Sequence, residues 1–213
     1  MSIKNNLRLI KKTIPDNVTL VAVSKTKTSA NILEAYNSGH KIFGENKVQE
    51  LEKKHKELPS DIEWHMIGNL QKNKVKYIAP FISLIHSIDS IKLLQEVNKR
   101  AIQNNRTIKC LLQVHIAKEE TKFGFKTHEI EEIVLKAKEF KNIKIIGLMA
   151  MATFTDDTNQ INKEFKVINN IYKNIKNRNI YILSTGMSND YKIAINNGSN
   201  MIRVGSAIFG KRN

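Results

Sequence analysis

The sequence predicts a (β/α)8 barrel, the α/β architecture also called the TIM barrel. Strand-like apolar runs alternate with amphipathic helices along the chain. Eight such runs are present, and the spacing from one to the next averages about 26 residues, slightly short for this barrel but within its range. The first strand is followed by "AVSKTKTS", which has no glycine. A doubly wound open sheet, the alternative, would show a glycine-rich phosphate loop at this point.

The predicted strands are short, and several are apolar on both faces, such as "LLQV" and "KIIGLMAM". Parallel strands that are covered by helices require this pattern. In chain order the strands are predicted at Leu20–Val23, Lys41–Phe43, Glu63–Ile67, Leu84–His86, Lys109–Ile116, Ile143–Met149, Ile180–Leu183 and Met201–Val204.

The helices between these strands show a single apolar stripe, as expected for helices packed on a sheet. Two stripes are clear: Ile133, Val134, Ala137 and Phe140 after Ile130, and Phe165, Ile168, Tyr172 and Ile175 after Ile161. No long helix follows the eighth strand, and we expect the segment Ser2–Lys12 to cover that position. The chain has no Gly/Ser linker or abrupt shift in composition, so residues 1–213 are expected to form a single domain.

The composition disfavours two classes of function, nucleic-acid binding and membrane association. The 41% hydrophobic content suits an ordinary core, and Cys110 in "IKCLLQV" is expected to be a small core residue. The net charge of +15 comes mainly from scattered lysines without an aromatic platform, which favours a solvated surface over a specific nucleic-acid site. Weak attraction to polyanions stays open. The N-terminus has no apolar signal region and no run is long enough to span a bilayer, so we expect a cytoplasmic protein without membrane contact.

In a barrel of this kind, functional residues gather at the C-terminal ends of the strands. The seventh strand is followed by "STGMSND" and the eighth by "RVGS". Small hydroxyl residues and backbone N–H groups in these two loops would suit a phosphate. Ordinary turns with helix N-caps would look the same in either loop alone. The presence of both stretches, in the two loops where barrels recurrently bind phosphate, favours a phosphate site.

Lys25 stands directly after the first strand, in "VAVSKTK". A desolvated lysine loses proton affinity, which frees its amine to attack a carbonyl and form a Schiff base. Two chemistries follow: an aldolase-type lysine acting on a sugar phosphate, or a lysine that holds pyridoxal 5′-phosphate (PLP), which is both an aldehyde and a phosphate ester. The structural alternative is a lysine that extends out of the barrel mouth into water.

Arg203 ends the eighth strand, which neighbours the first strand in a closed barrel. Arg203 and Lys25 are therefore expected to face the same small molecule. An arginine that faces a pyridine nitrogen would donate a hydrogen bond and oppose protonation of the ring, weakening the electron sink that PLP enzymes use. The alternative for Arg203 is a salt bridge at the surface or rim.

Taken together, these stretches resemble the pyridoxal phosphate homeostasis proteins of the YggS/PROSC type. The chain carries, in the family's order, "AVSKTK", "FGENKVQE", "WHMIGNLQKNK", "HSID", "GLMAM", "LSTGMSND" and "IRVGSAIFG". The resemblance runs from about Val18 to Gly210. It implies a fold similar to the N-terminal barrel of alanine racemase, without the C-terminal β domain of that enzyme.

The resemblance also implies the site residues. Lys25 matches the lysine that holds PLP as an internal aldimine, Asn46 a residue near the cofactor, and Arg203 the arginine that faces the pyridine nitrogen. His65 and Met149 are expected near the pocket, although either is as well explained as a core residue. His86, His115 and Cys110 show no ligand spacing, so no metal is expected. The phosphate cradle is matched by Ser184, Met187, Ser188, Gly205 and Ser206.

The chain departs from the family pattern at two places. Thr185 replaces the methionine of the usual "SMGMS", and in the loop Ala117–Gly124 the serine of the usual "SKSG" becomes Thr121, while Lys122 and Gly124 remain. The second change puts any partner or ligand role of this loop in doubt, but not that of the pocket.

Alanine racemases also need a second domain, which supplies a tyrosine as second base across the dimer. The chain ends at Asn213, just beyond the eighth strand, with no residues left for that domain. We therefore expect a monomer without catalytic residues that binds, stores or delivers PLP, with PLP-dependent apo-enzymes as further partners. The alternatives are a minimal PLP enzyme (an amino-acid racemase or lyase), a Schiff-base aldolase and an RNA-binding basic protein.

Overall fold

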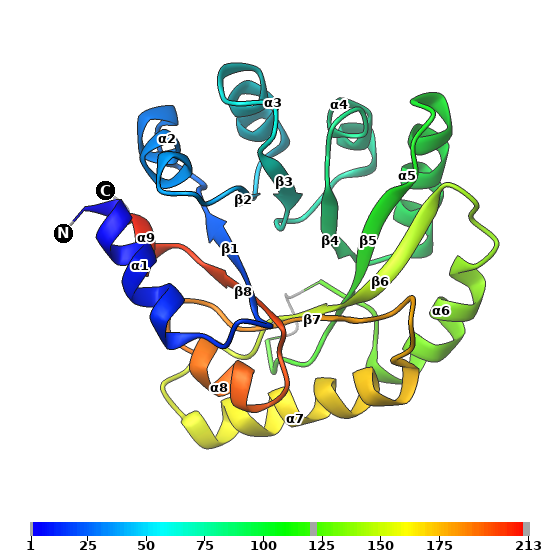
Figure 1. Ribbon diagram of the computed structural model, residues 1–213. Helices are drawn as coiled ribbons and strands as arrows, with labels where there is room; N and C mark the ends of the chain where they lie inside the picture. The colour runs from blue at the N-terminus through cyan, green and yellow to red at the C-terminus, as the bar shows by residue number, and fades with distance from the viewer. Residues whose placement is uncertain (1, 120–122, 211–213) are drawn as a thin grey trace.

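The computed structural model describes residues 2–119 and 123–210, which form a closed barrel of eight parallel strands (Figure 1). Each strand pairs with the next along the chain, and β8 pairs with β1 to close the ring. This confirms the predicted fold class. The strands are β1 Thr19–Val23, β2 Ile42–Glu45, β3 Glu63–Met66, β4 Leu84–Ile88, β5 Ile108–Val114, β6 Ile143–Ala150, β7 Ile182–Ser184 and β8 Met201–Val204.

The helices surround the outside of the barrel (Figure 1). Helix α1 packs against both α9 and α2, and so fills the position outside β8 and β1 that was expected for Ser2–Lys12. The α-helices are α1 Ile3–Thr13, α2 Ser29–Asn37, α3 Val48–Glu57, α4 Val75–Ile78, α5 Ile91–Gln103, α6 Ile130–Ala137, α7 Thr158–Ile175, α8 Tyr191–Asn196 and α9 Ser206–Phe209, and the short 3-10 helices are η1 Lys72–Lys74 and η2 Thr127–Glu129.

Side-chain caps start several of these helices. Ser2 accepts a hydrogen bond from the backbone N–H of Asn5 at the start of α1, and Ser90 accepts one from Leu93 at the start of α5. Thr28 and Asn31 form a reciprocal capping box on α2. Such caps satisfy N–H groups that have no partner within the helix. Turn and hydroxyl residues between the strands thus fix where each helix begins.

Some predicted strand bounds are wrong. β2 continues to Glu45 instead of ending at Phe43, which carries Glu45 into the barrel wall. β7 begins at Ile182 and not at Ile180, because the side chain of Asn177 accepts the N–H groups of Asn179 and Ile180 and closes a turn. Ile180 is buried all the same, so its apolar character reflects packing against the core and not strand pairing.

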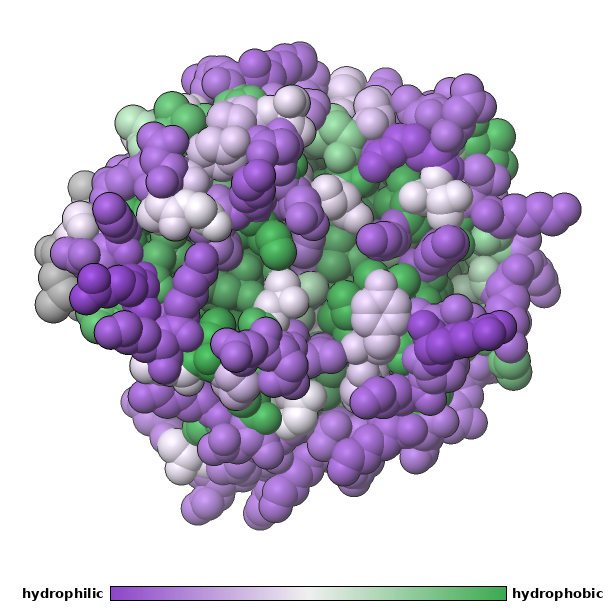
Figure 2. All heavy atoms as spheres, in the orientation of Figure 1, coloured by the Kyte–Doolittle hydropathy of each residue, from purple (hydrophilic) through white to green (hydrophobic). Residues whose placement is uncertain are grey.

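The apolar side chains form two layers. The larger cluster lies between the strands and the helices and includes Phe43, Trp64 and Phe165, each nearly inaccessible to solvent. Burying a side chain of this kind contributes about 1.5–3 kcal/mol. The barrel interior holds the smaller cluster of Val21, Leu84, Leu111, Ile146, Met149 and Met201. Figure 2 shows a largely hydrophilic periphery, with hydrophobic residues visible mainly toward the middle of that face.

Three further expectations concern single features. Cys110 is fully buried, and burial raises the pKa of its thiol, as expected for a core cysteine. Within residues 2–119 and 123–210, no helix has the length and apolar character needed to cross a membrane. The altered loop residues Thr121 and Lys122 lie outside the described residues.

Candidate functional site

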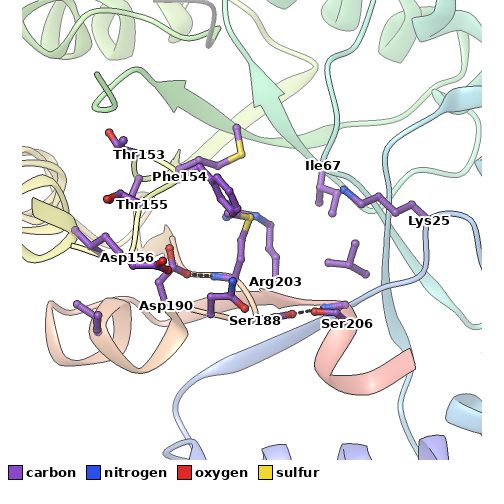
Figure 3. A pocket seen from close by; sticks show the side chains of 18 of the residues that line it. Lys25, Ile67, Thr153, Phe154, Thr155, Asp156, Ser188, Asp190, Arg203 and Ser206 are labelled. Carbon is purple, nitrogen blue, oxygen red and sulfur yellow. Dashed lines mark hydrogen bonds between the residues drawn. The ribbon is translucent and has the colours of Figure 1, made fainter. Parts of the chain in front are cut away.

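A cavity of about 580 Å³ opens at the C-terminal ends of the strands (Figure 3). Its walls come from the ends of β1, β2, β3, β6, β7 and β8, which are far apart in sequence. Its size lies in the range of small-molecule sites. All of the predicted site residues except Ser184 line it: Lys25, Asn46, Met187, Ser188, Arg203, Gly205 and Ser206.

Lys25 follows β1 and is partly buried on the cavity wall. In Figure 3 its side chain extends across the cavity toward Ile67. Lys27, two residues further on, lines the same cavity, but its Nζ donates to the backbone oxygen of Gly210 at 3.3 Å. The two lysines of the first loop therefore have different surroundings within one site.

Arg203 is buried inside the barrel, with 4% of its surface exposed, and so it is not the rim residue of the alternative prediction. Its Nη1 donates to the backbone oxygen of Ser184 at 2.9 Å and to its Oγ at 2.7 Å, and its Nη2 donates to the oxygen of Ala150 at 3.1 Å. Burial lowers the pKa of Arg203 to about 10, so the guanidinium stays charged at neutral pH. These bonds hold a cation at the wall of the cavity.

Ser184 was predicted in the phosphate cradle, but the structure gives it other contacts. Its hydroxyl is fully buried behind Arg203 and also lies 3.2 Å from Nδ1 of His86. Nε2 of His86 is in turn 3.0 Å from Nδ1 of His65. A continuous hydrogen-bonded chain therefore runs through the barrel interior from Arg203 to His65.

His86 was not predicted to support the site, yet it joins Ser184 to His65. In the sequence His86 stands out only for lacking metal-ligand spacing. The described residues contain no group of three His, Cys, Asp or Glu side chains suited to a metal. His65 lies in the interior chain. Met149 belongs to the interior apolar cluster, and Met151 lines the cavity instead. The usable signal was the position of His65 and His86 on neighbouring strands.

The buried histidines make stability depend on pH. Burial lowers the pKa from 6.5 to about 3 for His65 and to about 4 for His40, and places that of His86 well below 6.5. The folded state then binds fewer protons than the unfolded state, so stability is complete above pH 6.5 and is lost as the pH falls below it. We expect a loss of up to about 1.4 kcal/mol per pH unit for each histidine, measured by urea unfolding between pH 7 and 5.

A matched control for this prediction is His128→Gln, because His128 is exposed. This variant should show the same pH dependence as the wild type. A free energy of unfolding that stays constant from pH 7 to pH 5 would contradict the neutral, buried histidine chain.

The loops after β7 and β8 touch each other at the cavity floor. Ser188 Oγ accepts the backbone N–H of Gly205 at 3.2 Å, and Asp190 Oδ1 accepts that of Met187 at 2.6 Å. A Cβ added at Gly205 would lie 3.2 Å from Cβ of Val23, tighter than most real contacts. A glycine here therefore keeps β8 close to β1 and leaves the cavity open above the contact.

Asn46 supplies a direct test of whether the cavity suits a polar ligand. Its Oδ1 is buried and has no hydrogen-bond partner among the described residues. Gly68 allows this arrangement, because a Cβ there would lie only 2.4 Å from the backbone oxygen of Asn46. Buried acceptors in proteins nearly always accept a hydrogen bond. The unpaired Oδ1 of Asn46 therefore indicates that a bound ligand supplies the donor.

The donor set fits an anionic, aldehyde-bearing ring. Lys25 offers an amine, Arg203 a buried guanidinium, and Ser188 and Ser206 offer hydroxyl groups from two adjoining loops. The fold and the site together indicate the alanine racemase N-terminal domain family. The model of that family matches residues 1–213. That family is built on a barrel of this type.

Solved structures agree with this class. PipY of Synechococcus elongatus PCC7942 without PLP superposes with a TM-score of 0.93 at 31% identity, covering 98% of this chain and all of PipY. A structure of PipY with PLP bound gives 0.88 at the same identity. Alanine racemase from Streptomyces coelicolor A3(2) shares the fold, with a TM-score of 0.82 at 16% identity, and the match covers 99% of this chain and 58% of that racemase.

Curated relatives narrow the class further. The pyridoxal phosphate homeostasis protein of Helicobacter pylori is 40% identical over 195 residues, covering 90% of this chain and 87% of the relative. That of Aquifex aeolicus is 38% identical over 197 residues, covering 91% and 86%. The chain therefore belongs to the pyridoxal phosphate homeostasis protein family, as its sequence motifs predicted.

Proposed function

We propose that this protein binds PLP in the cavity of Figure 3 through Lys25 and serves PLP homeostasis by binding, storing or delivering it. The observation that carries the proposal is the convergence of an amine, a buried guanidinium and two hydroxyl-bearing loops in one cavity. PLP bound to PipY, which is 31% identical to this chain over nearly its whole length, supports it. The proposed unit is one barrel domain acting as a monomer.

Each part of the cavity then has a task. PLP supplies an aldehyde and an electron-withdrawing pyridine ring when bound. Lys25 provides the nucleophilic amine. Ser188, Gly205 and Ser206 bind the phosphate, with Met187 beside them, and Asn46 accepts a hydrogen bond from the ligand. Arg203 would hold the ring at its nitrogen, where a donor that stays protonated would keep the nitrogen from taking a proton.

We propose further that the protein does not turn over amino acids. Racemisation needs a base on each face of the substrate carbanion. Among the described residues that line the cavity there is no tyrosine, histidine or cysteine; the other groups that could act as a base are Lys27, whose amine bonds to Gly210, Asp190, whose Oδ1 accepts the N–H of Met187, and Asp156. An arginine at the ring nitrogen also disfavours the protonated ring on which carbanion stabilisation depends. PLP-dependent apo-enzymes are the proposed recipients.

The test combines PLP uptake with an exchange assay. The purified chain is saturated with PLP and incubated in deuterated water with a panel of L-amino acids. We expect a yellow protein and no sustained exchange of the α-proton. Sustained exchange or product formation would favour a minimal racemase or lyase, and a colourless protein that takes up no PLP would overturn the proposal.

A further inference from the structure

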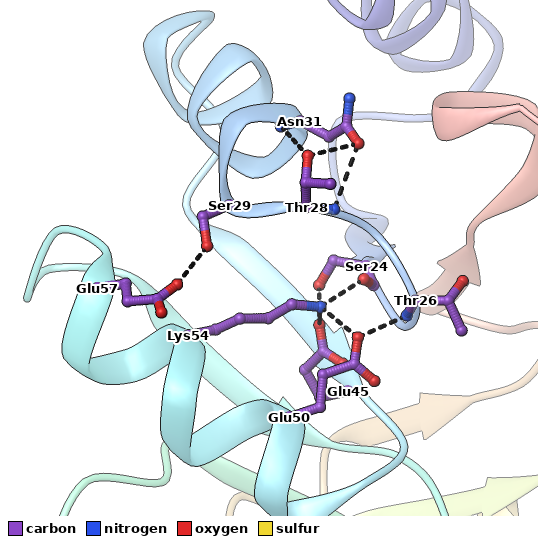
Figure 4. Close-up of polar contacts among 9 residues, drawn as sticks. All are labelled: Ser24, Thr26, Thr28, Ser29, Asn31, Glu45, Glu50, Lys54 and Glu57. Atoms are coloured by element: carbon purple, nitrogen blue, oxygen red, sulfur yellow. Dashed lines mark hydrogen bonds and ion pairs between the residues drawn. The ribbon is translucent and has the colours of Figure 1, made fainter.

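Helix α3 presents a polar stripe to the loop that carries Lys25. Glu50, Lys54 and Glu57 follow one another at i, i+4 and i+7, which places them on one side of the helix. Figure 4 shows Glu50 and Lys54 pointing at the segment between β1 and α2, and Glu57 pointing at Ser29, the first residue of α2. That segment consists of residues 24–28 and contains Lys25 at its second position.

Lys54 is the centre of these contacts. Its Nζ donates to the backbone oxygen of Ser24 at 2.8 Å, to Oε1 of Glu45 at 2.8 Å and to Oε1 of Glu50 at 2.7 Å. An ammonium group has three protons, so the donor capacity of Lys54 is fully used. Ser24 is bound a second time, because its Oγ donates to Oε1 of Glu45 at 2.6 Å. The residue before Lys25 is therefore fixed at both its backbone and its side chain.

The residue after Lys25 is held by the same helix. The backbone N–H of Thr26 donates to Oε1 of Glu50 at 2.6 Å. Thr26 has a φ of 65°, a left-handed conformation that threonine rarely adopts. Such a conformation persists only where its surroundings hold it, and Glu50 supplies that hold. Further along, Ser29 Oγ donates to Oε2 of Glu57 at 2.7 Å, which ties the start of α2 to the same stripe.

The cluster is buried, and its ionic character calls for an explanation other than stability. The side chain of Lys54 is 6% exposed and that of Glu45 is fully buried. Burial raises the pKa of Glu45, and the neighbouring Lys54 opposes that rise. Well-packed apolar residues often stabilise a fold as well as a buried ion pair does, whereas directional charged contacts fix one geometry. Here the geometry that they fix is the backbone on both sides of Lys25.

We propose that Lys54, acting with Glu45 and Glu50, is a positioning residue for Lys25. It holds the loop in the one conformation that directs the Lys25 side chain into the cavity. The inference rests on the proposed function, in which Lys25 is the residue that reacts with PLP. Lys54 itself does not line the cavity.

The first experiment compares Lys54→Met with Lys56→Met, two variants of α3. Lys56 is exposed and, among the described residues, pairs with Glu52 on the same helix, so it is the matched control. Each variant is titrated with PLP and with pyridoxine 5′-phosphate, which has the same ring and phosphate but an alcohol in place of the aldehyde. We expect Lys54→Met to slow covalent attachment of PLP by about tenfold or more. Its affinity for pyridoxine 5′-phosphate and both properties of Lys56→Met should match the wild type.

Equal weakening of both ligands in Lys54→Met would indicate a collapsed cavity and overturn the positioning role. Unchanged attachment of PLP would overturn it as well. Glu50→Gln is the second variant, for use if Lys54→Met fails to fold, because glutamine keeps an acceptor for Thr26 but removes the charge that faces Lys54. It should also slow attachment without changing the affinity for pyridoxine 5′-phosphate.

The second readout needs no ligand. Amide hydrogen exchange is measured on residues 24–27 of the PLP-free chain, and we expect it to become about tenfold faster or more in Lys54→Met, with Lys56→Met unchanged. Unaltered exchange in this segment would overturn the proposal. If the wild type took up no PLP, the proposed function would fail, and hydrogen exchange would still decide whether Lys54 fixes this loop.

Discussion

Lys25→Ala is expected to abolish covalent attachment of PLP to the protein. The variant removes the amine that extends into the cavity, while Arg203 and the loops that bear Ser188 and Ser206 stay in place. Non-covalent binding through the phosphate should therefore persist, but the absorbance band of the covalent adduct should be lost and replaced by that of the unreacted aldehyde. Absorbance spectra and equilibrium dialysis of the same samples separate these two effects.

Lys27→Ala is the control that shows whether the loss of attachment is specific to Lys25. Lys27 is the other lysine that lines the described cavity, and it lies only two residues from Lys25. We expect Lys27→Ala to keep the visible band and the attachment at Lys25. A Lys25→Ala protein that stays yellow, with PLP attached at Lys27, would show that the reactive amine has been assigned to the wrong residue.

Arg203→Met is expected to cost the fold about 2–5 kcal/mol of unfolding free energy. Methionine removes the donors to the backbone oxygens of Ser184 and Ala150 and to the hydroxyl of Ser184, all inside the barrel. Buried acceptors that lose their donors carry the full penalty of desolvation. Urea unfolding at pH 7.5, above the range in which the buried histidines titrate, measures the loss.

Two further variants make the Arg203 prediction specific. Arg100→Met removes a partly exposed arginine that pairs with Glu96 on the same helix, and it should cost less than about 1 kcal/mol. Arg203→Lys keeps the charge but offers only one nitrogen, so it should recover part of the loss. If Arg203→Met unfolded with the same free energy as the wild type, the interior hydrogen bonds would not support the site as argued above.

The barrel could be predicted from sequence because its signals are local. Each apolar run predicts one strand, and each apolar stripe, such as the one after Ile161, predicts one helix packed on the barrel. No long helix follows the eighth strand in sequence, and α1 lies in the position predicted for the segment that covers it. The start of β7 could not be predicted, because Ile180 has the apolar character of a strand residue but is held in a turn by Asn177. The hydropathy of a residue predicts whether it is buried. Whether the residue belongs to a strand depends on its backbone hydrogen bonds, which hydropathy does not predict.

Seven of the eight predicted site residues line the cavity, since parallel strands bring their C-terminal ends together, but the wall formed by the segment after β6 was not predicted. The role of Ser184 could not be predicted. It lies one short loop from Ser188, but its hydroxyl points behind Arg203 toward His86. Lys54 was missed for a related reason: on sequence it is one of many lysines on a solvated helix, and only the packing of α3 on β2 and β3 brings its amine to Ser24.

In the proposed function, Lys25 is the residue that holds PLP. The most direct test of this role is borohydride reduction of the wild-type protein after incubation with PLP, followed by peptide mapping by mass spectrometry. We expect the stable adduct on the peptide containing Lys25, with close to one cofactor per chain. Label spread over several surface lysines, or fixed at a lysine outside the cavity, would contradict it.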